Sequence, residues 1–216
     1  MFITNKASAA LLLTGAMALA ATSSATSMAA TYVETPMFAA KVGAGKLPSV
    51  DQRLPKIPSV VKMTGEKVIG RQGGELRTLI GRAKDVRLFV VYGYARLIGY
   101  NEKYELVPDI IQSVAVKDDR QFTFKLRQGH KWSDGHPFTS EDFRYWWEDV
   151  ANNKRTSPAG PPRLLLSEGQ PPVFEVLDKT TVRYTWPKAN PFFLPRLAGA
   201  SPLFIYRPAH YLKQYH

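Results

Sequence analysis

The side chains best suited to metal binding or proton transfer are four histidines and a few carboxylates. The histidines are six residues apart in two pairs, His130 with His136 and His210 with His216. Histidine pairs that bind zinc usually have closer helical spacing, or a carboxylate as a third ligand. Glu141 or Asp142 could supply such a carboxylate, which leaves a metal site open as an alternative. The spacing itself favours no metal and no cofactor.

The acidic residues between 141 and 149 do not suggest general acid/base catalysis. They fall on the polar side of a predicted helix: Glu141, Asp142, Glu148 and Asp149. We interpret them as a solvated face that balances Arg144, not as a catalytic carboxylate pair. The sequence also lacks a Gly-x-Ser-x-Gly motif and a glycine-rich phosphate loop. We therefore predict no catalytic residue and no enzymatic activity.

Three tryptophans could stack on a sugar ring. Trp146 and Trp147 share one apolar helix face with Phe143 and Val150, and Trp132 precedes that helix. Aromatic side chains on one helix face usually belong to a core, which is the interpretation we favour here. An exported carbohydrate-binding or enzymatic module remains an alternative, based on these tryptophans and a proline-rich region before them.

Residues 121–150 predict a strand, a tight loop and a capped helix. Phe122, Phe124 and Leu126 alternate with polar residues, as in a half-buried strand. Asp134-Gly135 has turn chemistry, because glycine adopts a positive φ without strain. Thr139 is placed to cap the helix, with Asp142 three residues later as an approximate capping box.

The composition is that of a folded cationic protein. The 216 residues carry a net charge of +11, and 44% of them are hydrophobic. Lysine and arginine are spread along the chain, so we predict no nucleic-acid partner. Cysteine is absent, which excludes disulfides, thiolate metal sites and a cysteine nucleophile.

The N-terminus predicts export. Lys6 precedes an apolar stretch over residues 7–21, which is short for a membrane span. Small residues follow, and we place signal-peptide cleavage near Ala29 or Ala30. A retained membrane anchor is the alternative. No second long apolar run occurs, so we expect a soluble exported chain.

The rest of the chain predicts a mixed α and β pattern. Residues 31–70 suggest an extended arm, 75–80 a strand, and 86–97 a helix capped by Asp85. Two hairpins are predicted, the first over residues 114–126 and the second over residues 174–186. Short helices are expected at 192–197 and from Pro208, and the sequence ends at His216 just after the second one starts.

Several motifs in this order resemble the extracytoplasmic solute-binding proteins of family 5. These are the oligopeptide-, dipeptide- and nickel-binding components of ABC importers. The segments that carry the resemblance are Leu-Val-Pro-Asp-Ile-Ile (106–111), Phe-Thr-Phe-Lys-Leu-Arg-Gln-Gly (122–129), Lys-Trp-Ser-Asp-Gly (131–135), Pro-Phe-Thr-Ser-Glu-Asp-Phe (137–143) and Val-Leu-Asp-Lys-Thr-Thr-Val (176–182). The resemblance covers residues 73–216.

The resemblance implies an α/β fold like that of type II periplasmic binding proteins, with local α+β character. The chain would be a signal peptide (1–30), an N-terminal arm (31–70) and an incomplete first lobe with its antiparallel hairpin subdomain (71–216). It implies a periplasmic monomer that holds a small molecule or peptide between two lobes and delivers it to an inner-membrane permease complex. A truncated gene product without independent binding is the alternative.

The resemblance also assigns site residues. The loop after the first strand would contact ligand, and it corresponds here to Arg82, Lys84 and Asp85. The alternative is that both cations are surface charges. The Trp132-Ser133-Asp134-Gly135 loop would be a structural corner. Family members bind peptides, nickel complexes, opines or sugars, and the net charge of +11 slightly favours an anionic solute.

Overall fold

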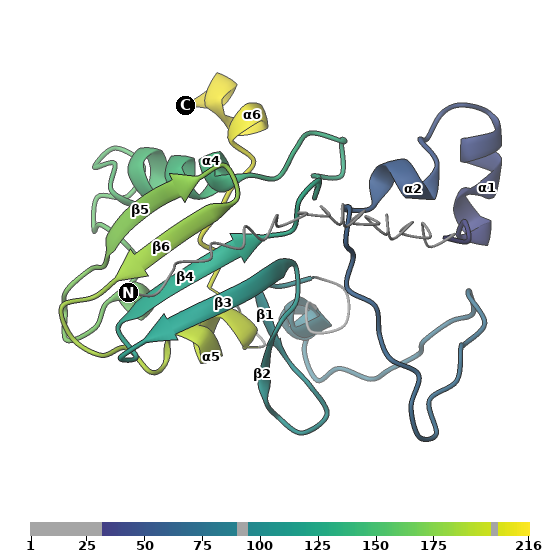
Figure 1. The fold of residues 1–216 in the computed structure, drawn as a ribbon, viewed down its shortest axis with the longest axis horizontal. Coiled ribbons are helices and arrows are strands. Elements are labelled where there is room, and N and C mark those ends of the chain that lie inside the picture. Colours follow the sequence, from purple (N-terminus) through teal and green to yellow (C-terminus); the bar gives the residue numbers. More distant parts are fainter. Residues whose placement is uncertain (1–31, 90–94, 200–202) are drawn as a thin grey trace, which may run out of the picture. The chain divides into compact units, whose positions relative to one another are not determined.

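The computed structural model describes residues 32–89, 95–199 and 203–216 (Figure 1). The predicted signal peptide therefore lies outside the described residues. The α-helices are α1 (Pro36–Gly43), α2 (Val50–Arg53), α4 (Ser140–Arg144), α5 (Phe193–Ala198) and α6 (Ala209–Leu212). The other helical segments are the 3-10 helices η1 (Ala83–Phe89), η3 (Arg163–Leu165) and η4 (Lys213–Tyr215), and the π-helix η2 (Tyr145–Ala151).

Within the described residues, six strands form two antiparallel sheets. A short pair joins β1 (Ile98–Tyr100) to β2 (Leu106–Pro108). The larger sheet has the order β3-β4-β6-β5, from β3 (Ile111–Lys117), β4 (Gln121–Leu126), β5 (Val173–Asp178) and β6 (Thr181–Thr185). Both predicted hairpins are confirmed. Asp118 and Asp119 form the first turn, with φ values of 55° and 47°.

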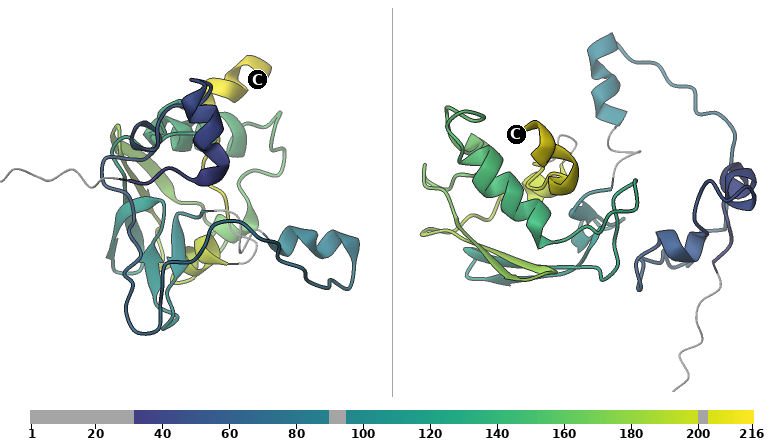
Figure 2. Two further views of the ribbon diagram at one scale, coloured as in Figure 1. Left: turned by 90° about the vertical axis from the view of Figure 1, so that its right-hand side faces the viewer. Right: turned by 90° about the horizontal axis from the view of Figure 1, so that it is seen from above.

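The two hairpins meet along β4 and β6, which places four large side chains on one face of the sheet. Phe122 lies opposite Tyr184, and Phe124 lies opposite Val182. All four are at most 2% exposed. Figures 1 and 2 show α4 and its continuation η2 crossing the sheet on one side. The alternation predicted from the sequence thus turns apolar side chains inward.

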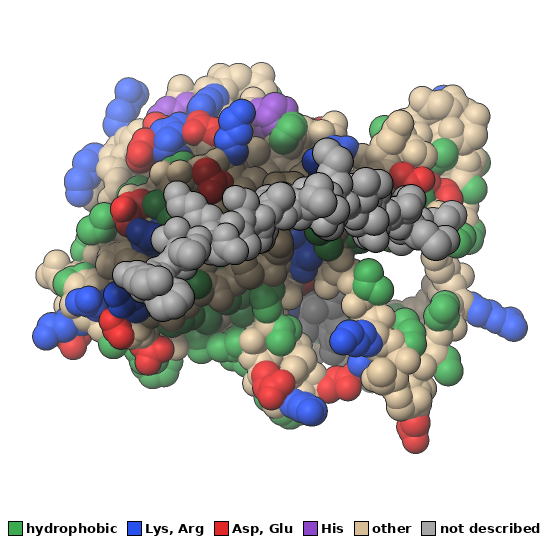
Figure 3. Space-filling view, in the orientation of Figure 1, with side chains coloured by type: hydrophobic (Ala, Val, Ile, Leu, Met, Phe, Trp, Pro, Cys, Tyr) green, Lys and Arg blue, Asp and Glu red, His purple; other side chains and the backbone are tan. Residues whose placement is uncertain are grey.

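The opposite face of the sheet is polar. Arg183 Nε donates to Thr123 Oγ1 at 3.2 Å, and its Nη1 lies 3.9 Å from Glu175 Oε2. Figure 3 shows Lys and Arg side chains spread over the visible surface and interleaved with acidic ones. The positive charge is dispersed on this face, as the sequence predicts.

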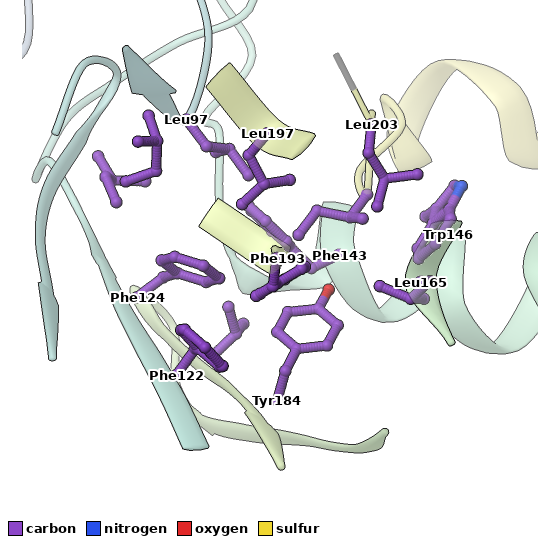
Figure 4. Close-up of a cluster of buried hydrophobic side chains, with 14 of the residues drawn as sticks. Leu97, Phe122, Phe124, Phe143, Trp146, Leu165, Tyr184, Phe193, Leu197 and Leu203 are labelled. Carbon is purple, nitrogen blue, oxygen red and sulfur yellow. The ribbon is translucent and has the colours of Figure 1, made fainter. Parts of the chain in front are cut away.

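Phe193 of α5 fills the centre of the core (Figure 4). Its ring centroid lies 5.1 Å from that of Phe122 and 4.6 Å from that of Trp186. Trp186 donates its indole N–H to the carbonyl of Leu165 at 2.8 Å. The short helix predicted at 192–197 therefore docks the end of the second hairpin against the first.

The predicted capped helix forms, and its second half widens. Thr139 Oγ1 accepts from the Glu141 N–H at 3.3 Å, and Asp142 Oδ2 accepts from the Thr139 N–H at 2.9 Å. From Tyr145 the helix is a π-helix, and the Asn152 N–H donates to the Trp147 carbonyl, five residues earlier.

Of the tryptophans on this helix, Trp146 is 3% exposed, so the sugar-stacking alternative is wrong for it. Trp147 is half-buried and packs against Phe174, with ring centroids 6.1 Å apart. Both tryptophans contribute to the core, as the sequence analysis favoured.

The polar helix face is confirmed for three of its four acids. Arg144 contacts Glu141 at 2.6 Å, Glu148 at 2.5 Å and Asp149 at 3.2 Å. Asp142 is the exception, because it is 2% exposed and belongs to the interior. The helical position alone could not reveal this, since the N–H group that draws Asp142 inward comes from a distant residue, Ala209.

One prediction for the N-terminal half is wrong, and two are wrong in part. Residues 75–80 form no strand, because no strand of the described chain pairs with them, and Leu79 is fully exposed. Of the helix expected over 86–97, residues 86–89 belong to the 3-10 helix η1, residues 90–94 lie outside the described residues, and residues 95–97 are not helical. The Leu97 carbonyl instead accepts from the Asp109 N–H at 3.0 Å.

The arm, expected to be extended, contains α1 and α2. Pro36 occupies the first turn of α1, directly after Thr35, and this combination is a helix-start signal that the sequence analysis missed. Within the described residues, no helix combines the length and the apolar character needed to cross a membrane.

Candidate functional site

The three residues assigned to ligand contact lie on an exposed turn. Arg82 Nε is 3.3 Å from Asp85 Oδ2, and the Arg82 side chain is 70% exposed. Lys84 is also exposed. Asp85 lies inside the 3-10 helix and does not cap it, because that helix begins at Ala83. The structure thus brings Arg82 and Asp85 together as a local ion pair. None of the three lines the cavity beside Trp132 or the one beside Tyr145 and His216.

The Trp132-Ser133-Asp134-Gly135 loop is a tight turn. The Gly135 N–H donates to the Trp132 carbonyl at 2.9 Å, and the Trp132 N–H donates to the His136 carbonyl at 2.8 Å. Gly135 has a φ of 89°, a conformation that a residue with a Cβ adopts only with strain. The turn predicted at Asp134-Gly135 is therefore present.

Asp134 connects this turn to the C-terminal helix α6. Its Oδ1 accepts from the His136 N–H at 2.9 Å, and its Oδ2 is 2.6 Å from His210 Nε2. The His210 hydrogen bond, the larger effect, and the His136 N–H lower the pKa of Asp134. The rings of His136 and His210 stack with centroids 3.8 Å apart.

The histidines that suggested a metal site in the sequence are paired differently in the structure. His136 pairs with His210, not with His130, and the two rings lie parallel at an angle of 8°. Among the residues described, no group of three histidine, cysteine or acidic side chains is arranged to hold a metal ion. The histidines thus join two segments of the fold.

A cavity of about 860 Å³ lies between the N-terminal helices and this loop. Its lining comes from two segments far apart in sequence, and consists of Phe38, Lys41, Lys46, Leu47, Pro48, Gln52, Arg53, Lys131, Trp132, Ser133, Asp134 and Gly135. The sequence analysis named the loop residues as a structural corner and did not identify the residues of the arm. A cavity of this size suits a small organic ligand.

Hydrogen bonds hold the arm against the residues before the loop. The Lys56 N–H donates to the Gln128 carbonyl at 2.9 Å, and Arg127 Nη1 donates to the Ile57 carbonyl at 3.2 Å. Lys131 Nζ donates to the carbonyl of Gln52 at the end of α2. The two walls of the cavity are therefore fastened to each other by the chain itself.

Arg53 is the most constrained cation of the cavity. It pairs with Glu34 and also donates its Nε–H to the Pro48 carbonyl at 3.0 Å. Its guanidinium carbon lies 5.3 Å from the ring centroid of Phe38. The hydrogen bond from Arg53 is the main cause of the lowered pKa of Glu34. This network orders the junction between α1 and α2.

Comparison with known proteins gives the family. Residues 105–214 match the bacterial extracellular solute-binding proteins, family 5 (the middle region of that family). This is more than half of the chain, so the protein belongs to this family of non-enzymatic solute-binding proteins.

The chain is similar to larger periplasmic proteins. It is 30% identical over 199 residues to the periplasmic alpha-galactoside-binding protein of Rhizobium meliloti, and this covers 81% of the chain and 28% of the relative. The structure of an oligopeptide-binding protein OppA matches 87% of the chain with a TM-score of 0.70 and 33% identity, and 29% of OppA is covered.

The structure of MelB from Agrobacterium fabrum, in complex with stachyose, matches 87% of the chain with a TM-score of 0.60 and 26% identity, and 31% of MelB is covered. The chain thus spans under a third of each relative. The mixed α/β fold agrees with theirs over that part.

Proposed function

We propose that this chain is part of the substrate-binding component of an ABC importer in the periplasm. It would help to capture a small solute and deliver it to a permease complex in the inner membrane. The match of residues 105–214 to family 5 carries this proposal. The structural similarity to OppA, with a TM-score of 0.70, supports the substrate-binding role. The Rhizobium relative is a periplasmic protein by name, which supports the proposed location.

The chain would supply the first part of one lobe. We propose a signal peptide at 1–30, an arm at 31–70 and lobe residues at 71–216, including the hairpin subdomain formed by β3, β4, β5 and β6. Arg82, Lys84 and Asp85 are proposed to face the ligand. Burial of most of a ligand's surface needs walls on several sides, so the opposite lobe would complete the cleft.

The ligand is proposed to be a peptide or an oligosaccharide. The OppA structure is named for oligopeptides, while the Rhizobium relative is named for alpha-galactosides and the MelB structure contains stachyose. Lobe closure on either ligand would shift an equilibrium between open and closed states.

Thermal unfolding with candidate ligands tests solute binding. A ligand that binds only the folded state at a hundred times its Kd stabilises it by about 2.7 kcal/mol. An upward shift of the melting temperature with a mixed tri- and tetrapeptide pool supports a peptide ligand, and a shift with stachyose supports an oligosaccharide. No shift with either contradicts binding of a peptide or an oligosaccharide by this chain and favours a gene product without independent binding of such ligands.

The importer role has its own test, which is uptake of the labelled ligand by cells. Deletion of the coding sequence should abolish uptake, and restoring it should recover transport. Unchanged uptake in the deletion strain would contradict the role.

A further inference from the structure

The cavity between α1, α2 and residues 131–135 has an excess of positive charge. Four lysine or arginine side chains line it, against one acid, Asp134. Lys41 and Lys46 are exposed and form no ion pair with any residue that the structure describes. Their ammonium groups are therefore available to a ligand, whereas Arg53 is already paired with Glu34.

The one acid of the lining is engaged by its own neighbours. Both carboxylate oxygens of Asp134 have partners, the N–H of His136 and the ring of His210. These contacts reduce its ability to neutralise Lys41 or Lys46. The potential inside the cavity is therefore positive, and it favours the entry of an anion.

Apolar surface lies beside these cations. Phe38, Leu47 and Pro48 come from the arm, and Trp132 comes from the loop. Trp132 is half-buried, with its ring 5.3 Å from that of Phe138 in an edge-to-face contact, so part of the indole stays accessible. Aromatic and aliphatic surface of this kind binds the non-polar body of a solute.

We propose that this cavity binds a small organic carboxylate with an apolar or aromatic body. The carboxylate accepts charge-assisted hydrogen bonds from Lys41 and Lys46, and the body lies against Phe38 and Trp132. Since hydrogen bonds of the protein itself fasten the arm to residues 127–131, little ordering is left to oppose binding. An uncharged sugar would leave both ammonium groups without partners.

Calorimetric titration of the purified full chain tests the proposal with a matched pair of probes. N-acetyl-glutamyl-phenylalanine has two carboxylates and a phenyl ring, and N-acetyl-glutaminyl-phenylalanine amide is its neutral counterpart. We expect the acid to bind at least tenfold more tightly than the neutral probe, and less tightly at high salt. Equal affinity for the two probes, or no binding of the acid, would overturn the proposal.

Two variants localise the binding. Lys41→Ala with Lys46→Ala should reduce the affinity for the acidic probe at least tenfold. The control pair Lys62→Ala with Lys103→Ala removes the same charge from exposed positions outside the cavity and should change it less than twofold. An equal loss in both pairs would show diffuse electrostatic attraction and overturn the site.

Phe38→Ala tests the apolar half of the site while leaving the sheet core intact. Its affinity for N-acetyl-glutamyl-phenylalanine should fall several-fold, with an unchanged circular dichroism spectrum. Sulfate that binds as tightly as the acidic probe would overturn the role of the apolar body. The inference does not rest on the importer role, because these probes and variants report on the cavity alone and not on transport.

Discussion

The buried carboxylate of Asp142 accepts a hydrogen bond from the backbone N–H of Ala209, which lies 67 residues further along the chain. The distance is 3.1 Å, and the other oxygen of Asp142 accepts from the Thr139 N–H at 2.9 Å. Burial raises the pKa of Asp142, because desolvation outweighs these two hydrogen bonds. One side chain thus caps α4 and also fixes the start of α6.

Asp142→Ala should lower the free energy of unfolding by about 2–4 kcal/mol, because it leaves a buried and a partly buried N–H donor without an acceptor. Urea denaturation followed by circular dichroism measures the change. Asp149→Ala is the control on the same helix, since Asp149 makes a partly exposed contact with Arg144, and it should cost under about 1 kcal/mol. Equal decreases in the free energy of unfolding for the two variants would mean that the buried hydrogen bonds of Asp142 do not stabilise the fold more than a surface contact does.

Phe193→Ala should destabilise the fold by about 3–5 kcal/mol, because Phe193 is fully buried among Phe122, Tyr184 and Trp186. The neighbouring Phe192 is 63% exposed and provides a matched control, since Phe192→Ala removes the same atoms. That variant should change stability by under about 1 kcal/mol. Comparable midpoints for the two variants in urea would contradict the proposed core.

Stability should fall in acid, partly through Glu141. The hydrogen bond from Arg144, the largest cause, and that from Lys213 lower the pKa of Glu141 from 4.5 to about 2. The carboxylate form is therefore favoured by folding, and its contribution is present above pH 4.5 and lost as the pH falls towards 2.

Because Glu141 is 43% exposed, its contribution is about 1 kcal/mol after allowance for solvent screening. Urea denaturation between pH 2 and 6 should show a smaller pH dependence in Glu141→Gln than in the original chain. Glu148→Gln, which loses a single contact with Arg144, should retain most of the slope. The idea fails if Glu141→Gln leaves the slope unchanged.

Asp134→Asn should loosen α6, because it removes the carboxylate that contacts His210 Nε2. Hydrogen exchange should become faster at the amides of Tyr211 and Leu212, which both donate to the Pro208 carbonyl. Asp178→Asn changes an aspartate in a remote turn and should leave these amides unaffected. Unchanged protection at Leu212 in Asp134→Asn would show that the Asp134–His210 contact does not hold α6.

Local sequence patterns correctly predicted the strand, turn and helix cap that depend only on neighbouring residues. The alternation of Phe122 and Phe124, the Asp118-Asp119 turn and the Thr139 cap each depend on a few neighbouring residues. Pairing of β4 with β6 depends on contacts about 60 residues apart, such as Phe122 with Tyr184, and no short pattern encodes it.

The errors have the same physical origin. Residues 75–80 have the composition of a strand, but a strand also needs a neighbour, and none of the described strands lies beside them. Asp142 has the spacing of a surface acid, but Ala209 draws it inward. The cavity forms only because the arm folds back on the loop, and no local pattern predicts that contact. The sequence analysis therefore singled out Trp132 but not Lys41 or Lys46.

The π-helix gives the segment Tyr145–Ala151 wider turns than those of an α-helix. Its wider turns bring Arg144 within 3.2 Å of Asp149, five positions away. Loss of one residue here could return the backbone to about 3.6 residues per turn with little rotation of the residues that follow, because the wider turns already accommodate one extra residue. A deletion in this segment would therefore leave Ala151, which is 2% exposed, near the core position that it fills, whereas a deletion in α4 would rotate it by about 100°.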